Sequence, residues 1–96
     1  MKKLEQSEIA TQLGTLPGWL LHEGKLRRAY KFETFERAIA FMLAAVPAIQ
    51  QMDHHPEWAN VYNRVTVDLT THSAGGVTCK DFKLAAALED LAGRLL

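Results

Sequence analysis

The chain has 96 residues, and its 11 basic and 11 acidic side chains give a formal net charge of zero at neutral pH. This balance, without a basic stripe, argues against direct nucleic-acid binding, and no apolar run approaches the ~20 residues needed to cross a bilayer. Cys79 is the only cysteine, which excludes an intrachain disulfide and CxxC-type zinc motifs. We therefore expect one cytoplasmic domain, residues 1–96, that gains stability from oligomerisation because so short a chain buries only a small core.

The first third of the chain predicts a helix followed by a hairpin. Apolar side chains recur at helical spacing over residues 7–13, and Gly14 marks the end of that helix. Two extended runs, residues 19–22 and 26–32, lie on either side of Glu23-Gly24. The second run alternates apolar and polar residues, so the pair predicts two antiparallel strands.

A long helix is predicted from Thr34, a favourable N-cap residue, to about Gln51. Pro47 lies inside it, where proline removes the hydrogen bond to the carbonyl of Leu43 and costs on the order of 3 kcal/mol. We therefore expect a bend or an early end at Pro47. Two apolar stripes suggest that the helix packs on the sheet and on a second partner. The first stripe is Phe35, Ala38, Ile39, Met42, Val46 and Ile49, and the second is Phe41, Ala44, Ala45 and Ala48.

The second half predicts another hairpin and a closing helix. Residues 58–61 and 64–70 are the expected strands, residues 73–76 a loop, and Thr78 the N-cap of the last helix with Asp81 in its first turn. The element order α-β-β-α-β-β-α predicts an α+β fold of two layers, a four-stranded antiparallel sheet with three helices on one face. The expected core residues of the last strand and helix are Val65, Val67, Leu69, Leu84, Leu88, Leu91 and Leu95.

Three of the four histidines lie at the two ends of the second predicted hairpin. His54 and His55 precede its first strand and His72 follows its second, so an antiparallel pairing brings them to the same end of the sheet. Asp81 can reach this end across the glycine-containing loop. Two alternatives remain open: loop histidines with a capping aspartate, or a zinc or iron site. The adjacent pair His54-His55 lacks the spacing of helical metal ligands, so we expect no metal.

The same region resembles the pterin-4a-carbinolamine dehydratase family. The resemblance implies the fold described above, with dimers that in some members pair into tetramers through helices. It also implies dehydration of the 4a-hydroxytetrahydropterin left by an aromatic amino acid hydroxylase, with quinonoid dihydropterin as the product and no separate cofactor. The matching segments are Asp53-His54-His55-Pro56-Glu57-Trp58, Asn60-Val61-Tyr62-Asn63 with Val65, Leu69-x-Thr71-His72, Gly76-Val77-Thr78 with Asp81, and upstream Phe32-x-x-Phe35 and Ala38-x-x-Phe41-Met42.

The resemblance also implies roles for individual residues. His54 and His72 would be the principal acid-base pair, His55 a third histidine that assists, and Asp81 the group that orients a histidine. The substrate-binding walls would be His54, His55, Pro56, Trp58, Thr71, His72, Ser73 and Ala74. Trp58 has a second interpretation, as a residue of the sheet core.

One position departs from the family pattern. The family usually has an acid four residues before the first histidine, and here Gln50 stands there, which can form hydrogen bonds but cannot act as a base. We expect a slower or altered enzyme that keeps its site. The alternative function is a non-catalytic interaction protein, a dimerisation cofactor of transcription or an assembly protein, which the two apolar stripes of the long helix would serve.

Overall fold

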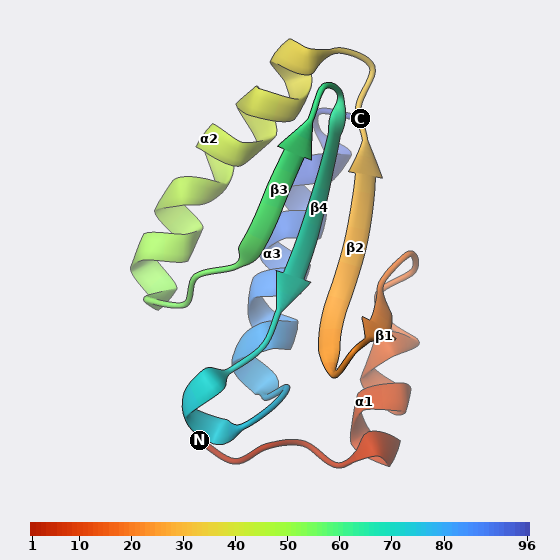
Figure 1. The fold of residues 1–96 in the computed structure, drawn as a ribbon, viewed down its shortest axis with the longest axis vertical. Coiled ribbons are helices and arrows are strands. Elements are labelled where there is room, and N and C mark those ends of the chain that lie inside the picture. Colours follow the sequence, from red (N-terminus) through yellow and green to blue (C-terminus); the bar gives the residue numbers. More distant parts are fainter.

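The computed structural model describes residues 1–96, and its elements follow the predicted order (Figure 1). The strand and helix boundaries lie within about one residue of those expected from sequence, which confirms both hairpins and all three helices. One difference is that the predicted loop 73–76 begins as a single 3-10 turn. The elements are α1 (Gln6–Leu13), β1 (Leu20–His22), β2 (Lys25–Lys31), α2 (Phe35–Met52), β3 (Glu57–Val61), β4 (Arg64–Leu69), η1 (His72–Ala74) and α3 (Cys79–Gly93).

The four strands form one antiparallel sheet in the order β1-β2-β4-β3. Val65, Val67 and Leu69 of β4 are buried, as their alternation predicts, and their partners on β2 include the buried Leu26 and Tyr30. The residues between them face away from the helices. The sheet therefore has one face in the core and one open face.

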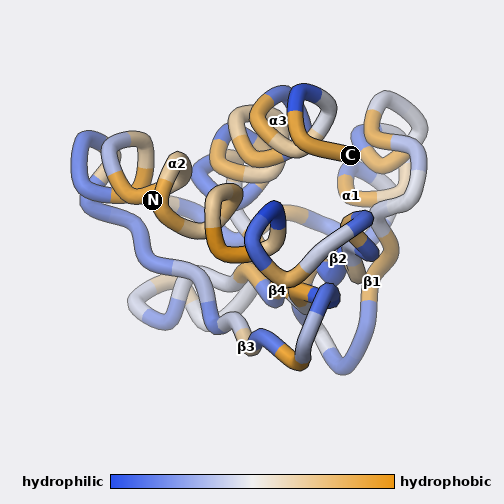
Figure 2. Tube along the Cα trace, turned by 90° about the horizontal axis from the view of Figure 1, so that it is seen from above, coloured by the Kyte–Doolittle hydropathy of each residue, from blue (hydrophilic) through white to orange (hydrophobic).

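The three helices cover one face of this sheet (Figure 2). Buried side chains of α2 and α3 pack together with those of β2 and β4 in a single core. In α3 the buried residues include Leu84 and Leu88, as predicted, whereas Leu91 and Leu95 are only half-buried at the margin of the core. The predicted stripe is therefore confirmed in full for Leu84 and Leu88 and in part for Leu91 and Leu95, which pack against the core while Ala92 is fully buried in the last turn.

Pro47 does not end α2. The helix continues to Met52, so of the two predicted outcomes the early end is wrong, and the bend stays a prediction. Pro47 is exposed, which leaves the unpaired carbonyl of Leu43 able to bond water, while Ala45 and Ile49 on either side of it remain buried. Burial of these flanking residues in the core, where α2 packs on α3 and on β4, offsets the cost of the proline.

The buried face of α2 combines residues from the two predicted stripes. Its buried residues are Ala38, Phe41, Ala45 and Ile49, which recur at helical spacing. Neither stripe is buried as a whole, so the predicted division of the helix surface is wrong. An apolar face remains outside the core, where Phe35, Leu43 and Val46 have exposed fractions of 44%, 67% and 44%.

Two aromatic side chains attach α3 to the N-terminal half of the sheet. Trp19 Nε1 and Tyr30 Oη both donate to Glu89 Oε1, at 2.8 and 2.7 Å. Burial is the main cause that raises the pKa of Tyr30, so its hydroxyl keeps its proton and remains a donor.

None of the helices combines the length and the apolar character required to span a membrane.

Candidate active site

The candidate site lies where β3 begins and β4 ends. Asp53 adopts the left-handed conformation at the end of α2, with a φ of 48°, and turns the chain toward β3. After β4, Thr71 pairs with Gly76 in an isolated bridge, and Thr78 then starts α3. These connections bring the segments before β3, after β4 and at the start of α3 together, as the sequence predicts.

Asp81 lies at the centre of this junction and has an exposed fraction of 0%. Its Oδ2 accepts hydrogen bonds from Thr78 N at 2.9 Å and Thr71 Oγ1 at 2.8 Å, and its Oδ1 lies 2.6 Å from His54 Nε2. The contact with Thr78 is half of a capping box at the start of α3. The capping interpretation and the histidine-orienting interpretation of Asp81 therefore both describe its contacts.

The hydrogen-bond network assigns the protons around Asp81. A carboxylate only accepts, so Nε2 of His54 carries a proton and donates it to Oδ1. The single proton of the Thr71 hydroxyl also goes to Asp81, so the Thr78 hydroxyl, 2.8 Å away, must donate to Thr71. Lys80 N in turn donates to Thr78 Oγ1, which completes a directed chain that ends at the carboxylate.

The other ring nitrogen of His54 remains open. Only 9% of the residue is exposed, yet Nδ1 has no hydrogen-bond partner in the protein. The only buried side-chain nitrogen or oxygen without a partner is Nε of Arg28, so Nδ1 of His54 must reach solvent. In neutral His54 this nitrogen carries the lone pair, which makes it the atom through which the ring can exchange a proton with a bound molecule.

His72 has a carboxylate partner that the sequence prediction missed. Its Nε2 lies 3.0 Å from Glu57 Oε2, while Glu57 Oε1 accepts from Lys25 Nζ at 2.5 Å. These contacts lower the pKa of Glu57, the bond from Lys25 most and the bond from His72 next. Glu57 stands within the motif that resembles the family, but pairing it with Lys25 requires the order of the strands, which the sequence does not provide.

His55 pairs with the residue that departs from the family pattern. Its Nε2 lies 2.9 Å from Oε1 of Gln50, in the last turns of α2, and both side chains are exposed. All three histidines thus have Nε2 bound to a side-chain oxygen. Two of these oxygens belong to carboxylates and the third to a neutral amide.

The other residues expected to contact substrate differ in how far they are exposed. Pro56 and Ala74 are half-buried, Ser73 is exposed, and Thr71 is buried beside Asp81. Trp58 is opposite Val67, a residue of the helix-facing side of the sheet, and its ring meets Phe41 of α2 edge-on at 6.5 Å. This packing agrees with the interpretation of Trp58 as a core residue, and a substrate contact for it stays a prediction.

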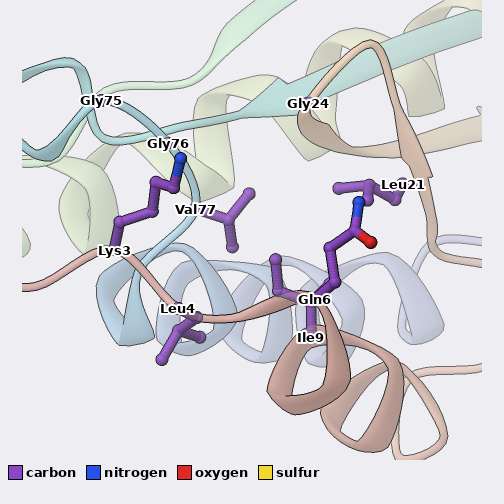
Figure 3. A pocket seen from close by; sticks show the side chains of 9 residues that line it. All are labelled: Lys3, Leu4, Gln6, Ile9, Leu21, Gly24, Gly75, Gly76 and Val77. Carbon is purple, nitrogen blue, oxygen red and sulfur yellow. The ribbon is translucent and has the colours of Figure 1, made fainter.

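A polar hollow of about 290 Å³ adjoins His72 and lies against Gly24, Lys25 and Gly76. A second hollow, about 160 Å³, shares Gly24 and Gly76 but extends toward the N-terminal segment, with Lys3 and Gln6 at its rim and a partly apolar lining (Figure 3). Lys3 reaches over Gly76, and Leu4 N donates to Val77 O at 2.9 Å.

No group of three or more His, Cys, Asp or Glu side chains is arranged to hold a metal ion.

Comparison with known proteins identifies relatives across almost the whole chain. The family model for pterin 4 alpha carbinolamine dehydratase matches residues 2–91. A protein of Solibacter usitatus, provisionally named a pterin-4-alpha-carbinolamine dehydratase, is 54% identical over 90 residues, which cover 94% of this chain and 95% of that protein. A relative of the same provisional name from Sulfolobus acidocaldarius is 42% identical and covers 93% of this chain and 98% of its own length.

Solved structures agree with these matches. The crystal structure of a transcriptional coactivator/pterin dehydratase from Brucella melitensis superposes with a TM-score of 0.92 at 42% identity, covering 96% of this chain and 100% of that one. A pterin dehydratase-like protein identified as a RuBisCO assembly factor shares the fold, with a TM-score of 0.64 at 20% identity over 78% of this chain and 87% of that one. From its sequence and its fold, this chain belongs to the pterin-4-alpha-carbinolamine dehydratase family.

Proposed function

We propose that this chain is a cytoplasmic dehydratase that converts 4a-hydroxytetrahydropterin to quinonoid dihydropterin and so recycles the pterin used by an aromatic amino acid hydroxylase. The observation that carries the proposal is the convergence of His54 and Thr71 on one buried carboxylate, Asp81, at the end of the sheet where His72 follows. Membership of the family supports the substrate class. The reaction proposed here uses histidine acid-base chemistry and needs no cofactor.

The reaction requires one proton to be added and one to be removed. The C4a–O bond breaks as the hydroxyl accepts a proton and leaves as water, and N5 loses its proton while its electron pair forms the C4a=N5 double bond. An imidazolium can supply the first proton and a neutral imidazole can accept the second, at the pH where both forms of histidine are populated. The two rings then return to their starting states by exchanging protons with water.

The arrangement of His54 and His72 suits these two roles. In each ring Nε2 is held by a carboxylate, which leaves Nδ1 to face a bound pterin. Asp81 orients His54 through a short charge-assisted hydrogen bond of 2.6 Å to Nε2. His55 would assist, with a neutral partner in Gln50.

Stopped-flow absorbance of freshly generated 4a-hydroxytetrahydropterin tests the proposal. The protein should accelerate the decay of this compound, with or without chelator, and replacing His54 or His72 with alanine should remove most of the acceleration. His22, the fourth histidine, lies on β1 beside Glu23 and provides the matched control, so H22A should retain full activity. If H54A is as active as the unmodified protein, the assignment of the site is wrong.

We also propose that the exposed apolar face of α2 binds a second copy of this chain. Phe35, Leu43 and Val46 are large apolar side chains of one helix that are exposed to water, and exposed apolar surface of this kind marks an interaction site where it is extensive. A homodimer or homotetramer would cover it. The same surface supports the second candidate function, a non-catalytic dimerisation cofactor or assembly protein. That function predicts that H54A binds its partner as well as the unmodified protein does.

A further inference from the structure

We propose that Glu57 is a positioning residue for His72 and that Lys25 in turn holds Glu57. This inference rests on the proposed dehydratase function, because it concerns which ring nitrogen His72 presents to the substrate. His72 is 81% exposed, and its ring has one hydrogen bond to the protein, from Nε2 to Glu57 Oε2 at 3.0 Å. Without that bond, nothing in the structure would select one orientation or one tautomer of this ring.

The open face of the sheet determines where Glu57 points. Glu57 on β3 is paired with Asp68 on β4, and Asp68 is paired with Arg27 on β2. Arg27 binds Asp68 through two nitrogens, each at 2.8 Å, and this contact lowers the pKa of Asp68. Two carboxylates on adjacent strands repel each other, and the arginine offsets that repulsion on the side of Asp68.

Lys25 offsets the repulsion on the side of Glu57. Its Nζ binds Oε1 of Glu57 across the intervening strand β4, so the two oxygens of Glu57 have different partners, Lys25 and His72. This arrangement turns Oε2 toward the end of the sheet where His72 lies. Asp68 has its own cation, so Lys25 remains available to Glu57.

The charge of Glu57 selects the tautomer of His72. The bonds from Lys25 and His72 lower the pKa of Glu57, which is therefore a carboxylate at neutral pH and can only accept. Nε2 of neutral His72 must carry the proton, and Nδ1 keeps the lone pair on the outer side of the ring. His54 has the same tautomer through Asp81, so both members of the proposed acid-base pair present the same ring nitrogen to the substrate.

Asp81 and Glu57 differ in their contribution to folding. Asp81 is buried and also caps α3, so its loss affects folding, whereas Glu57 is a surface residue whose side chain contacts only Lys25 and His72 among hydrogen-bonding partners. A substitution of Glu57 therefore separates orientation of the histidine from stability. If the pair is only a surface ion pair of no consequence, the same substitution leaves the tautomer of His72 unchanged.

The test uses long-range ¹H–¹⁵N correlation spectra of the imidazole rings in the full chain, recorded where the histidines are neutral. We expect His72 to be mainly the Nε2–H tautomer in the unmodified protein and a mixture in E57Q, with a smaller change in K25M and none in K25R. Glu33→Gln is the matched control, because Glu33 is also exposed and paired, with Arg37, but lies away from the histidines.

The rate of dehydration gives the second measurement. E57Q should reduce the catalysed rate by about two- to fivefold, the range expected for an exposed ion pair, and E33Q should not change it. An unchanged tautomer ratio of His72 in E57Q overturns the proposal, whatever happens to the rate. A changed tautomer ratio in a protein that accelerates no dehydration supports the role of Glu57 and shows instead that the proposed function is wrong.

Discussion

Replacing Asp81 with asparagine separates the capping role of this residue from its role toward His54. The amide oxygen can take the place of Oδ2 and continue to accept from Thr78 N and the Thr71 hydroxyl, both within 2.9 Å. The amide nitrogen then faces Nε2 of His54 and donates to it. His54 must therefore move its proton to Nδ1, and the lone pair that faced the substrate is lost.

The expected magnitudes differ for stability and activity. The variant keeps its hydrogen bonds but loses their charge, so the free energy of unfolding should fall by about 1–2 kcal/mol. The catalysed rate should fall by about 10²-fold or more, because general acid-base transfer through His54 loses its proper tautomer. Alanine is less informative here. It leaves three buried donors unpaired at about 1–3 kcal/mol each, a large part of the stability of a small domain.

Two assays check these values. Urea unfolding measures the change in stability, and stopped-flow decay of 4a-hydroxytetrahydropterin measures the rate. Asp90→Asn is the control, because Asp90 is an exposed acid of the same helix, paired with Arg94, and should change stability by less than about 0.5 kcal/mol and the rate not at all. If D81N folds and retains the full rate, Asp81 does not act through the tautomer of His54.

Three further predictions concern other parts of the molecule. Arg27 lowers the pKa of Asp68 below its ordinary value of 3.8, so the pair stabilises the fold above that pH, and this contribution is lost as the pH falls through the pKa of the folded state. The free energies of unfolding of D68N and the unmodified protein, measured in urea, should differ by at most about 1 kcal/mol at neutral pH. The two values should converge in acid. The proposed contact between copies through α2 predicts that the unmodified protein sediments as an oligomer and L43E as a monomer, whereas unchanged sedimentation of L43E would exclude this face of α2 as the interface. Q50E gives His55 a charged partner and should raise the dehydration rate by about two- to fivefold in stopped flow, and an equal rate would mean that His55 takes no part in proton transfer.

Local chemistry in the sequence predicted most of the fold. Thr78 and Asp81 form the expected capping box, and Val65, Val67 and Leu69 are buried as their alternation indicates. These features depend on neighbours a few residues apart, so a linear pattern contains them. The gathering of the histidines at one end of the second hairpin also followed from antiparallel pairing alone.

The division of α2 into buried and exposed faces could not be predicted in this way. Apolar residues cover more than half of its circumference, so periodicity alone did not determine which of them would meet the sheet. Packing against β4 and α3 selected Phe41 and Ala45 and left Leu43 and Val46 exposed. The same packing maintains the helix through Pro47, because two buried neighbours outweigh one missing hydrogen bond.

The sequence by itself determined the order of the elements, the two hairpins, the cap of the last helix and the end of the sheet at which His54, His72 and Asp81 lie. Only the tertiary structure decided the partners of His54 and His72. Asp81 lies 27 residues from His54, Glu57 lies 15 from His72, and Lys25 lies 32 from Glu57. Such contacts depend on strand order and on the packing of α3 against the sheet, which position side chains that no local spacing relates.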